Sequence, residues 1–452
     1  MSAPLYFSLV NLGCPKNTVD SEGLLATMAL AGHVFVEDPL EADVCVVNTC
    51  GFLEASRREA ADILAELADA RGRRQTPLLV AVGCLVERAG GSDGLDAFLR
   101  DADARVGFAD YPRLADICTG LVQARPAKGY AGAVSLPPAY MGWLDQPRMR
   151  IGSEASAYLK IGEGCSNGCA YCAIPLIRGR RVSRPMSSIL KEARELVASG
   201  VRELNVIAQD VTAYGMDRSG ESSPRFADLL RGLLAMPEQV WFRILYAHPL
   251  HLTESILEVM ASDPRVCPYL DLPLQHVNNA MLQRMSRGYD RRRVEEVMGW
   301  IRRTIPDMAL RTTFIVGHPG EGEAEFEELL AFVNEGHFDH MGAFVWSPEP
   351  GTASVEMPGR VDPAVAESRC ARLMEAQSCL SASRLRSRCG REVQMLLEWK
   401  DRKGWHGRTI WQAPEVDGQT LLSGRFPGRQ VGDFVRVRIT GATHYDCRAE
   451  GV

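Results

Sequence analysis

The feature that most constrains this chain is an alternation of short apolar runs with amphipathic stretches, which occurs in two separate blocks. In the first block, three apolar runs predict strands, and two stretches with helical periodicity between them predict helices. In chain order these segments are Leu5–Val10, Asp20–Ala31, Asp43–Val47, Glu54–Ala70 and Leu78–Val82. A β-α-β-α-β order is typical of a parallel sheet covered by helices. We therefore predict a small parallel α/β domain over residues 1–132.

The alternation resumes on a larger scale from residue 158 onward. Six β-type runs predict strands: Tyr158–Ile161, Leu204–Ile207, Trp241–Tyr246, Tyr269–Leu272, Arg311–Val316 and Gly342–Trp346. Amphipathic stretches between and after them predict helices: Ser187–Ala198, Phe226–Leu234, Arg291–Arg303, Glu323–Asn334 and Pro363–Arg388. About six β/α units in roughly 200 residues suit a partial or full parallel barrel, in which functional residues lie at the carboxyl ends of the strands. We assign this barrel to residues 151–388.

Two further segments depart from this alternation. Residues 123–147 are rich in Pro, Gly and Ala and lack periodicity, which predicts a linker that we place at residues 133–150. From Cys389 onward, short β-type runs are separated by turns that contain glycine, and these runs are Glu392–Leu397, Gln419–Leu422 and Phe434–Thr440. This pattern predicts a small antiparallel β-barrel over residues 389–452.

The 13 cysteines are an odd number in a chain of 452 residues, which is a poor match to a secreted disulfide framework. The first residues contain no basic segment followed by an apolar stretch, so we predict no signal peptide. No apolar run is long enough to span a membrane, so we expect no membrane association. We therefore expect a cytoplasmic protein in a reducing compartment, where clustered cysteines serve as metal ligands or catalysts.

Three cysteines lie on one predicted loop directly after the strand Tyr158–Ile161. In the segment GEGCSNGCAYCAIP, Cys165, Cys169 and Cys172 form a C-x3-C-x2-C arrangement, which we call the barrel triad. Thiolates spaced this closely converge on one metal centre, and cysteine is the usual ligand of iron–sulfur clusters. A zinc loop is the alternative, but zinc sites usually show a second cysteine pair and a fourth protein ligand, and no such pair follows here. We therefore predict a 4Fe-4S cluster held by three cysteines, which leaves one iron open.

A second set of cysteines is spread over the first block. Cys14, Cys50 and Cys84, which we call the N-terminal triad, each lie just past the carboxyl end of a predicted parallel strand. Because these ends share one edge of an open α/β sheet, we expect the three thiols to meet. A buried cysteine is also a common small hydrophobe, but three at equivalent positions predict a second 4Fe-4S cluster. The other seven show no ligand-like grouping and are expected to be structural: Cys45, Cys118, Cys267, Cys370, Cys379, Cys389 and Cys447.

These motifs resemble the methylthiotransferase branch of the radical S-adenosylmethionine superfamily, over nearly the whole chain. The barrel triad is similar to the superfamily signature, and the N-terminal triad with a C-terminal barrel similar to the TRAM module is similar to the branch. Several segments resemble the RimO subgroup: LGCPKNTVDSE (Leu12–Glu22), VSRP (Val182–Pro185), AQDVTAYG (Ala208–Gly215), YLDLPLQH (Tyr269–His276) and RTTFIVGHPGE (Arg311–Glu321). The relatives that modify tRNA typically carry a glutamine after the first cysteine, where Pro15 and Lys16 stand here.

The resemblance implies an enzyme that adds a methylthio group to the β-carbon of one aspartate in the twelfth protein of the small ribosomal subunit, either free or within the ribosome. In the implied mechanism, the cluster of the barrel triad binds S-adenosylmethionine. An electron from a donor such as flavodoxin or ferredoxin cleaves this cofactor to a radical that abstracts hydrogen. The cluster of the N-terminal triad carries the sulfur that is methylated and transferred, so a sulfur donor is implied. We predict no catalytic acid or base, because the cofactors break the C–H bond.

Residues at the ends of the barrel strands are candidates for the S-adenosylmethionine pocket. Gln209 and Asp210 follow the second strand, and Gln275 and His276 follow the fourth. We predict four residues to bind the cofactor, and these are Gln209, Gln275, Gly317 and Gly320. The two glycines let the backbone approach the adenine closely. His318 stands where the family motif usually has phenylalanine, and we expect local repacking there without a change of chemistry.

Two other functions are alternatives to methylthio transfer to a ribosomal protein. If the chain were a tRNA adenosine methylthiotransferase, it would bind RNA through the C-terminal arginines Arg425, Arg429, Arg436 and Arg438. That segment holds ten Lys and Arg against eight Asp and Glu, which is weakly basic for a surface that contacts many phosphates. The whole chain has a formal charge of −6, which suits a basic ribosomal protein as the partner. The other alternative is a non-catalytic iron–sulfur sensor, which would need no S-adenosylmethionine pocket.

Overall fold

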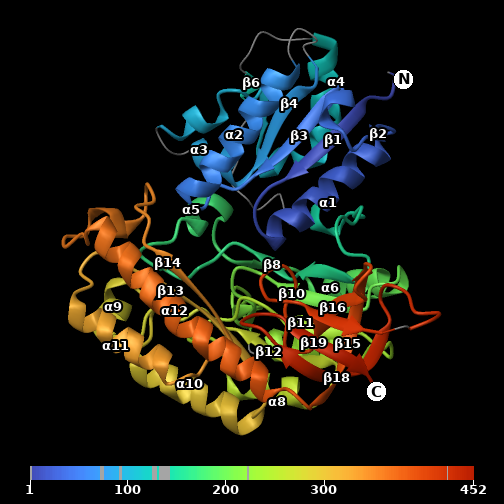
Figure 1. Cartoon of the computed structure of the whole chain (residues 1–452). Helices are drawn as coiled ribbons and strands as arrows, with labels where there is room; N and C mark the ends of the chain where they lie inside the picture. The colour runs from blue at the N-terminus through green and yellow to red at the C-terminus, as the bar shows by residue number, and fades with distance from the viewer. Residues whose placement is uncertain are drawn as a thin grey trace.

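A computed structural model describes residues 3–71, 76–90, 94–124, 130–131, 143–220, 223–424 and 426–452. Figure 1 shows three domains in chain order, with the N-terminal domain standing above the central one and the C-terminal domain beside its lower part. This architecture confirms the predicted fold class of two parallel α/β domains followed by a small β-barrel. No helix in the described part of the chain is both long and apolar enough to cross a membrane.

The N-terminal domain is built on a six-stranded sheet in which every pair of neighbouring strands is parallel. Its order is β2-β1-β3-β4-β5-β6, so the three predicted strands lie side by side at positions two to four. The strands are β1 (Tyr6–Asn11), β2 (Val34–Phe35), β3 (Val44–Thr49), β4 (Leu78–Gly83), β5 (Ala104–Val106) and β6 (Tyr130–Ala131). The helices that cover the sheet are α1 (Pro15–Leu30), α2 (Glu54–Arg71), α3 (Cys84–Ala89) and α4 (Leu114–Ala124).

Helix α1 begins five residues before the predicted start at Asp20. Its first turn carries Pro15, whose fixed φ and missing N–H suit the first helical position. The early part of α1 buries polar side chains, among them Lys16, Asn17 and Asp20. Because these polar residues face the protein interior, the apolar periodicity that marks a helix does not appear there.

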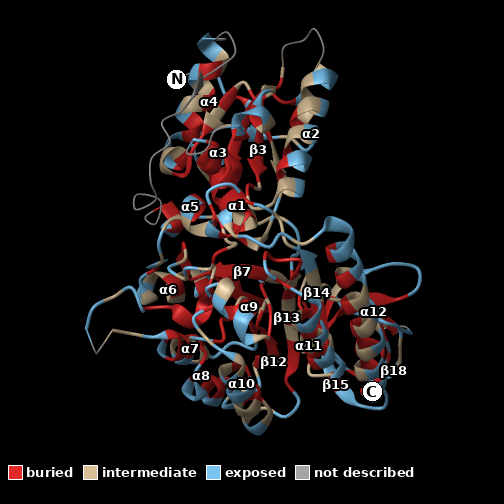
Figure 2. Ribbon diagram, turned by 90° about the vertical axis from the view of Figure 1, so that its left-hand side faces the viewer, coloured by how far each residue is buried: buried red, intermediate tan, exposed pale blue. Residues whose placement is uncertain are grey.

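The central domain is a six-stranded parallel sheet of order β14-β13-β12-β11-β10-β7, and no described pairing joins β14 to β7. It is therefore a partial barrel. The strands are β7 (Ser156–Lys160), β10 (Glu203–Ile207), β11 (Trp241–Ile244), β12 (Val266–Asp271), β13 (Ala309–Val316) and β14 (His340–Val345). The helices are α5 (Ile174–Arg178), α6 (Met186–Ala198), α7 (Phe226–Leu234), α8 (Glu254–Ala261), α9 (Asn279–Arg284), α10 (Arg291–Thr304), α11 (Glu323–Asn334) and α12 (Pro363–Ser387). Figure 2 shows buried residues concentrated in the strands and on the inner faces of these helices.

Two elements near the first barrel strand were not predicted. A two-stranded ribbon of β8 (Gly162–Glu163) and β9 (Val182–Ser183) brackets the cysteine loop and α5. Of the predicted linker, residues 133–142 lie outside the described residues. Residues 143–150 are held by contacts, since Trp143 packs on Tyr111 with ring centroids 5.1 Å apart, and Arg148 bridges Glu22 and Glu192.

The C-terminal domain is a closed five-stranded barrel of order β15-β16-β17-β19-β18. Its strands are β15 (Glu392–Lys400), β16 (Trp405–Thr409), β17 (Thr420–Ser423), β18 (Phe434–Ala442) and β19 (Cys447–Gly451). All neighbouring pairs are antiparallel except β17 and β19, which run parallel and close the barrel. Strands β16 and β19 were not predicted, because each is short and carries charged residues within it.

A buried group of charges fastens this barrel to the amino-terminal end of the central sheet. Glu203, the first residue of β10, accepts hydrogen bonds from Arg243 at 2.8 Å and from Arg408 at 3.1 Å. Arg408 also contacts Glu398 at 2.8 Å, and Arg243 donates to the carbonyl of Ile410 at 2.9 Å. We call Glu203, Arg243, Glu398 and Arg408 the floor cluster.

Candidate functional site

The barrel triad lies on the loop between β8 and α5, past the carboxyl end of β7. Burial raises the pKa of Cys172 to about 12, and the nearby Cys169 and Cys165 thiols raise it as well. The three thiols are therefore close enough to act on one another, as the spacing predicts. The guanidinium of Arg287 donates from Nη1 to Cys169 Sγ at 3.2 Å.

The N-terminal triad gathers at one edge of the N-terminal sheet. Cys14 is the residue before α1, Cys50 directly follows β3, and Cys84 is the first residue of α3, directly after β4. Burial, together with the nearby Cys50 and Cys14 thiols, raises the pKa of Cys84 to about 12 against the lowering effect of Arg178. Thiols separated by more than thirty residues in sequence thus meet because each follows a parallel strand.

Glycines beside the N-terminal triad allow its loops to pack on one another. A Cβ on Gly51 would lie 2.6 Å from the carbonyl oxygen of Cys84. Gly83 has φ +95°, and a Cβ there would lie 2.6 Å from the carbonyl oxygen of Thr49. Both positions therefore require glycine for a close approach of backbones, and this approach brings Cys50 and Cys84 to the same place.

The spacing of the thiols suits a cluster better than a single ion. Within the described ranges, only Asp210, His248 and His251 bring three potential ligand atoms within 4.8 Å of one another, so in each triad at least one pair of sulfurs is farther apart than this. A single tetrahedral ion needs ligands about 2.3 Å from one centre, whereas a 4Fe-4S core is a larger body. The Asp210 carboxylate is already occupied by donors, including His251, Thr212 and Asn167 of the cysteine loop. This group therefore supports the loop through hydrogen bonds.

The two predicted glutamines present unpaired acceptors. The side-chain oxygens Oε1 of Gln209 and Gln275 are buried and have no hydrogen-bond donor. Gln209 donates through Nε2 to Glu163, and Gln275 has the uncommon φ of +70°. Buried acceptors without a partner are costly and are rare in native proteins. The amino and hydroxyl groups of S-adenosylmethionine are donors that suit these two oxygens, so the residues present fit this cofactor.

The two predicted glycines have a packing role of their own. Gly317 has φ +73°, and a Cβ there would lie 2.5 Å from the Cβ of Ala366 on α12. Gly320 has φ +89°, and a Cβ there would lie 2.3 Å from Nε of Arg284. The positive φ angles therefore favour glycine at both positions whether or not an adenine lies beside them. Their approach to the cofactor stays a prediction.

His318 is fully buried between these glycines. Its Nδ1 lies 3.1 Å from the carbonyl oxygen of Pro319, and its ring meets Trp346 edge-on with centroids 6.1 Å apart. Burial lowers the pKa of His318 to about 4. The imidazole is therefore neutral at neutral pH and occupies its place largely as an aromatic ring.

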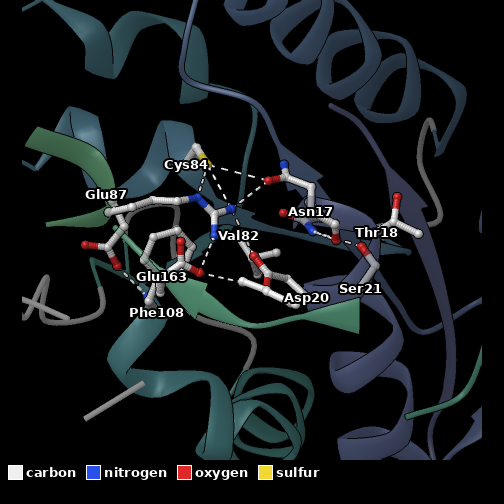
Figure 3. A network of polar contacts seen from close by, with 12 residues as sticks. Asn17, Thr18, Asp20, Ser21, Val82, Cys84, Glu87, Phe108 and Glu163 are labelled. Carbon is white, nitrogen blue, oxygen red and sulfur yellow. Dashed lines mark hydrogen bonds and ion pairs between the residues drawn. The ribbon is translucent and has the colours of Figure 1, made fainter. Parts of the chain in front are cut away.

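A network of buried charges joins the two cysteine-bearing domains. Arg178, the last residue of α5, donates to Cys84 Sγ from Nε at 3.3 Å and from Nη2 at 3.2 Å. The same guanidinium contacts Glu163 at 2.8 Å and Asp20 at 3.0 Å, and these side chains converge with Cys84 and Asn17 in Figure 3. Lys160 pairs with Asp20 at 2.7 Å and with Glu163 at 2.5 Å. We call Asp20, Lys160, Glu163 and Arg178 the junction cluster.

Sequence reasoning missed the junction cluster and Arg287. Burial raises the pKa of Glu163, but Arg178 and Lys160 lower it more and hold it at about 2, so the carboxylate is charged. One signal was available in the sequence, because Lys160 and Glu163 are charged residues within an otherwise apolar run directly before the cysteine loop. Arg178 and Arg287 had no such signal, because they reach the thiols from separate elements.

The C-terminal arginines considered for RNA binding are paired within their own domain. Arg436 and Arg438 lie 2.9 Å and 2.8 Å from the two carboxylate oxygens of Glu392. Arg429 lies 3.7 Å from Asp433, and Arg425 lies outside the described residues. These exposed pairs reduce the positive charge that this face offers to phosphates.

Three family models match successive parts of the chain. The uncharacterized protein family UPF0004 matches residues 6–105, the radical SAM superfamily matches residues 159–333, and the TRAM domain matches residues 389–452. Among solved structures, the radical S-adenosylmethionine methyltransferase TsrM from Kitasatospora setae is similar, with a TM-score of 0.57 and 16% identity. That match covers 78% of this chain and 75% of TsrM, and at this identity it shows the fold alone.

Curated relatives match over the full length. The ribosomal protein uS12 methylthiotransferase RimO of Geobacter sulfurreducens is 41% identical over 448 residues, which cover 98% of each chain. The RimO protein of Geotalea uraniireducens is 40% identical over 446 residues, which cover 98% of this chain and 97% of that one. Membership in the radical SAM superfamily implies an iron–sulfur cluster and S-adenosylmethionine. The chain therefore belongs to the RimO family of ribosomal protein uS12 methylthiotransferases, within the radical S-adenosylmethionine superfamily.

Proposed function

We propose that this protein adds a methylthio group to the β-carbon of an aspartate in ribosomal protein uS12. The observation that carries the proposal is the full-length identity of about 40% to proteins named for transfer to uS12. The meeting of the N-terminal triad at one sheet edge supports it, because a second cluster gives the transferred sulfur a place. We propose a cytoplasmic enzyme, because the proposed substrate is a ribosomal protein.

Each triad is proposed to hold one 4Fe-4S cluster. Cys165, Cys169 and Cys172 would hold the first, and Cys14, Cys50 and Cys84 the second, with one iron of each left without a protein ligand. When bound, these clusters and S-adenosylmethionine supply the radical and the sulfur that the reaction requires. Gln209 and Gln275 would accept hydrogen bonds from S-adenosylmethionine, and the backbone at Gly317 and Gly320 would lie beside its adenine.

The chain's own side chains position these groups and compensate their charge. Arg287 donates to Cys169, and Arg178 donates to Cys84, so each triad has one thiol beside a buried guanidinium. A hydrogen bond to a cluster sulfur orients the ligand and stabilises negative charge on it. The junction cluster holds the N-terminal domain against the central domain, because Asp20 of the first pairs with Lys160 and Arg178 of the second. An electron donor such as flavodoxin or ferredoxin and a separate sulfur donor complete the reaction.

A tRNA substrate is the second candidate, and the structure offers it less support. Arg429, Arg436 and Arg438 of the C-terminal barrel are paired with carboxylates, and the whole chain carries a formal charge of −6. A protein that neutralises many phosphates needs free cations on the contact face. The protein substrate is therefore the stronger proposal.

Mass spectrometry of ribosomal proteins and of tRNA from cells that lack this gene tests the substrate. We expect uS12 to lose the mass of one methylthio group, while tRNA nucleosides stay unchanged. A loss confined to tRNA would overturn the choice of substrate. Anaerobic incubation with S-adenosylmethionine and dithionite tests the chemistry, since a non-catalytic iron–sulfur sensor would produce no 5′-deoxyadenosine.

A further inference from the structure

Lys16 is a largely buried lysine that makes no ion pair with the described residues. It lies in the first turn of α1, two residues after Cys14, and only 6% of its surface is exposed. Its Nζ lies over the ring of Tyr246, 2.8 Å from the ring centroid. In the described part of the chain, no carboxylate lies within 4.0 Å of this nitrogen, and no acceptor takes a hydrogen bond from it. Its nitrogen is not among the fully enclosed side-chain atoms that lack a hydrogen-bond partner, so a ligand can reach it. An ammonium with so little exposed surface and no ion pair is costly to bury.

Another buried lysine, Lys160, has the ion pairs expected of a cation that stabilises the fold. Lys160 is fully buried and contacts Asp20 at 2.7 Å and Glu163 at 2.5 Å. Lys16 lies near the same junction but takes no part in these pairs. The fold can therefore neutralise a buried lysine there, whereas no described carboxylate pairs with Lys16.

The position of Lys16 points to a ligand that enters from the barrel. The charged groups that act on its ammonium are Cys14 of the N-terminal triad, Asp271, Arg178 and Glu163. Asp271 ends β12, but its carboxylate accepts from the backbone N–H of Tyr246 at 3.1 Å and lies 3.9 Å from Arg311. The Lys16 ammonium therefore faces the carboxyl ends of β11 and β12, beside the N-terminal triad.

We propose that the Lys16 ammonium binds the side-chain carboxylate of the target aspartate and so selects this residue, an inference that rests on the proposed function. The carbon that receives the methylthio group is bonded directly to this carboxylate. An ion pair with Lys16 therefore holds that carbon beside the N-terminal triad. Neither an amide nor a nucleobase carries a matching negative charge, so the same cation discriminates against both.

Binding to two forms of the substrate tests the inference. The probes are uS12 and a uS12 variant with asparagine at the modified position, titrated anaerobically against the cluster-loaded enzyme. We expect the wild-type enzyme to prefer the aspartate form by about tenfold or more, because a hydrogen bond between charged groups contributes that much. The preference should disappear in Lys16→Gln and Lys16→Met and persist in part in Lys16→Arg. The exposed Lys191→Gln is the matched control and should keep the full preference.

Two further measurements separate this role from a structural one. Lys16→Met should unfold at the same temperature as the wild type or higher, because it removes an uncompensated buried charge; a large loss of stability would instead assign Lys16 to the fold. Lys16→Gln should raise the KM for uS12 more than it lowers the rate of S-adenosylmethionine cleavage. If Lys16→Gln still preferred the aspartate form of uS12 as strongly as the wild type does, the inference about Lys16 would be wrong, and the proposed function would still stand. A wild-type enzyme that leaves uS12 unmodified would overturn the proposed function itself.

Discussion

The junction cluster and the floor cluster lie at opposite ends of the central sheet and have similar chemistry. In each, a buried glutamate lies between two cations, and these cations hold its pKa at about 2 against the effect of burial. The junction cluster also holds Asp20 between the same two cations. Both clusters fasten a neighbouring domain to the barrel. They differ in one contact, because Arg178 of the junction cluster donates to the sulfur of Cys84 and no cation of the floor cluster reaches a triad cysteine in the described residues. Buried charge alone therefore does not mark the functional end of the central domain, whereas contact with a triad thiol does.

The largest effect that tests this comparison is the loss of one triad. After anaerobic reconstitution we expect about eight irons per chain in the wild type. The count should fall to about four when Cys14, Cys50 and Cys84 are all changed to Ala, and also to about four when the three cysteines of the barrel triad are changed to Ala. Only the barrel-triad variant should stop producing 5′-deoxyadenosine. Iron analysis and chromatography of the nucleoside products measure both outcomes. A triple variant that kept the full iron content would contradict the corresponding ligand set.

Removing one arginine from each charge cluster separates structural from functional roles. Arg178→Met and Arg408→Met should each lower the free energy of unfolding by about 3–5 kcal/mol, because each leaves a buried carboxylate short of a partner. Denaturant unfolding measures this loss, and the exposed Arg58→Met serves as the control with little effect. Only Arg178→Met should alter the electron paramagnetic resonance signal of the second cluster. An altered signal in Arg408→Met would erase the distinction between the two ends.

Acid should weaken the floor cluster in a defined range of pH. Burial raises the pKa of Glu203, but Arg408 and Arg243 lower it more, to about 2 from an ordinary value near 4.5. Because the folded state has the lower pKa, the ionised carboxylate stabilises the protein above pH 4.5, and this contribution is lost as the pH falls towards 2. The contribution is worth about 3 kcal/mol.

Glu203→Gln provides the comparison for this pH dependence. The variant should be less stable than the wild type at neutral pH, and the gap should narrow between about pH 4.5 and pH 2 as the wild-type carboxyl takes up a proton. Free energies of unfolding measured across this range test the prediction. A gap that stayed constant would show that Glu203 is not the group that responds.

The smallest effect concerns the two arginines that donate to thiols. Arg287 contacts Cys169, two tyrosine hydroxyls and the carbonyl of Pro273, with no carboxylate within ion-pair distance in the described residues. Arg178 is already paired with Asp20 and Glu163. Arg287→Met should therefore lower the reduction potential of the barrel cluster by about 60 mV, or about 1.4 kcal/mol for one electron. Arg178→Met should shift its cluster by less, and redox titrations that found the reverse order would contradict this account of charge compensation.

Both triads were predictable from the sequence for different reasons. The barrel triad lies within eight residues of one loop, so its convergence needs no knowledge of the fold. The N-terminal triad was found because a residue that follows a parallel strand must lie at the carboxyl edge of the sheet. Helices α7 and α11 agree with the predicted ranges, since their apolar faces pack on the sheet and carry clear periodicity.

By itself, the sequence determined the order of the domains, the two sets of cysteines and the membership of the family, because these depend on local patterns and on strand ends. Only the tertiary structure decided which charged residues meet the thiols. Arg178 reaches Cys84 across 94 positions of sequence, and Glu203 meets Arg408 across 205. Such contacts arise where one domain packs on another, so the periodicity of the sequence does not predict them. The same packing leaves Lys16 buried without an ion pair among the described residues, whereas Lys160 is paired with Asp20 and Glu163.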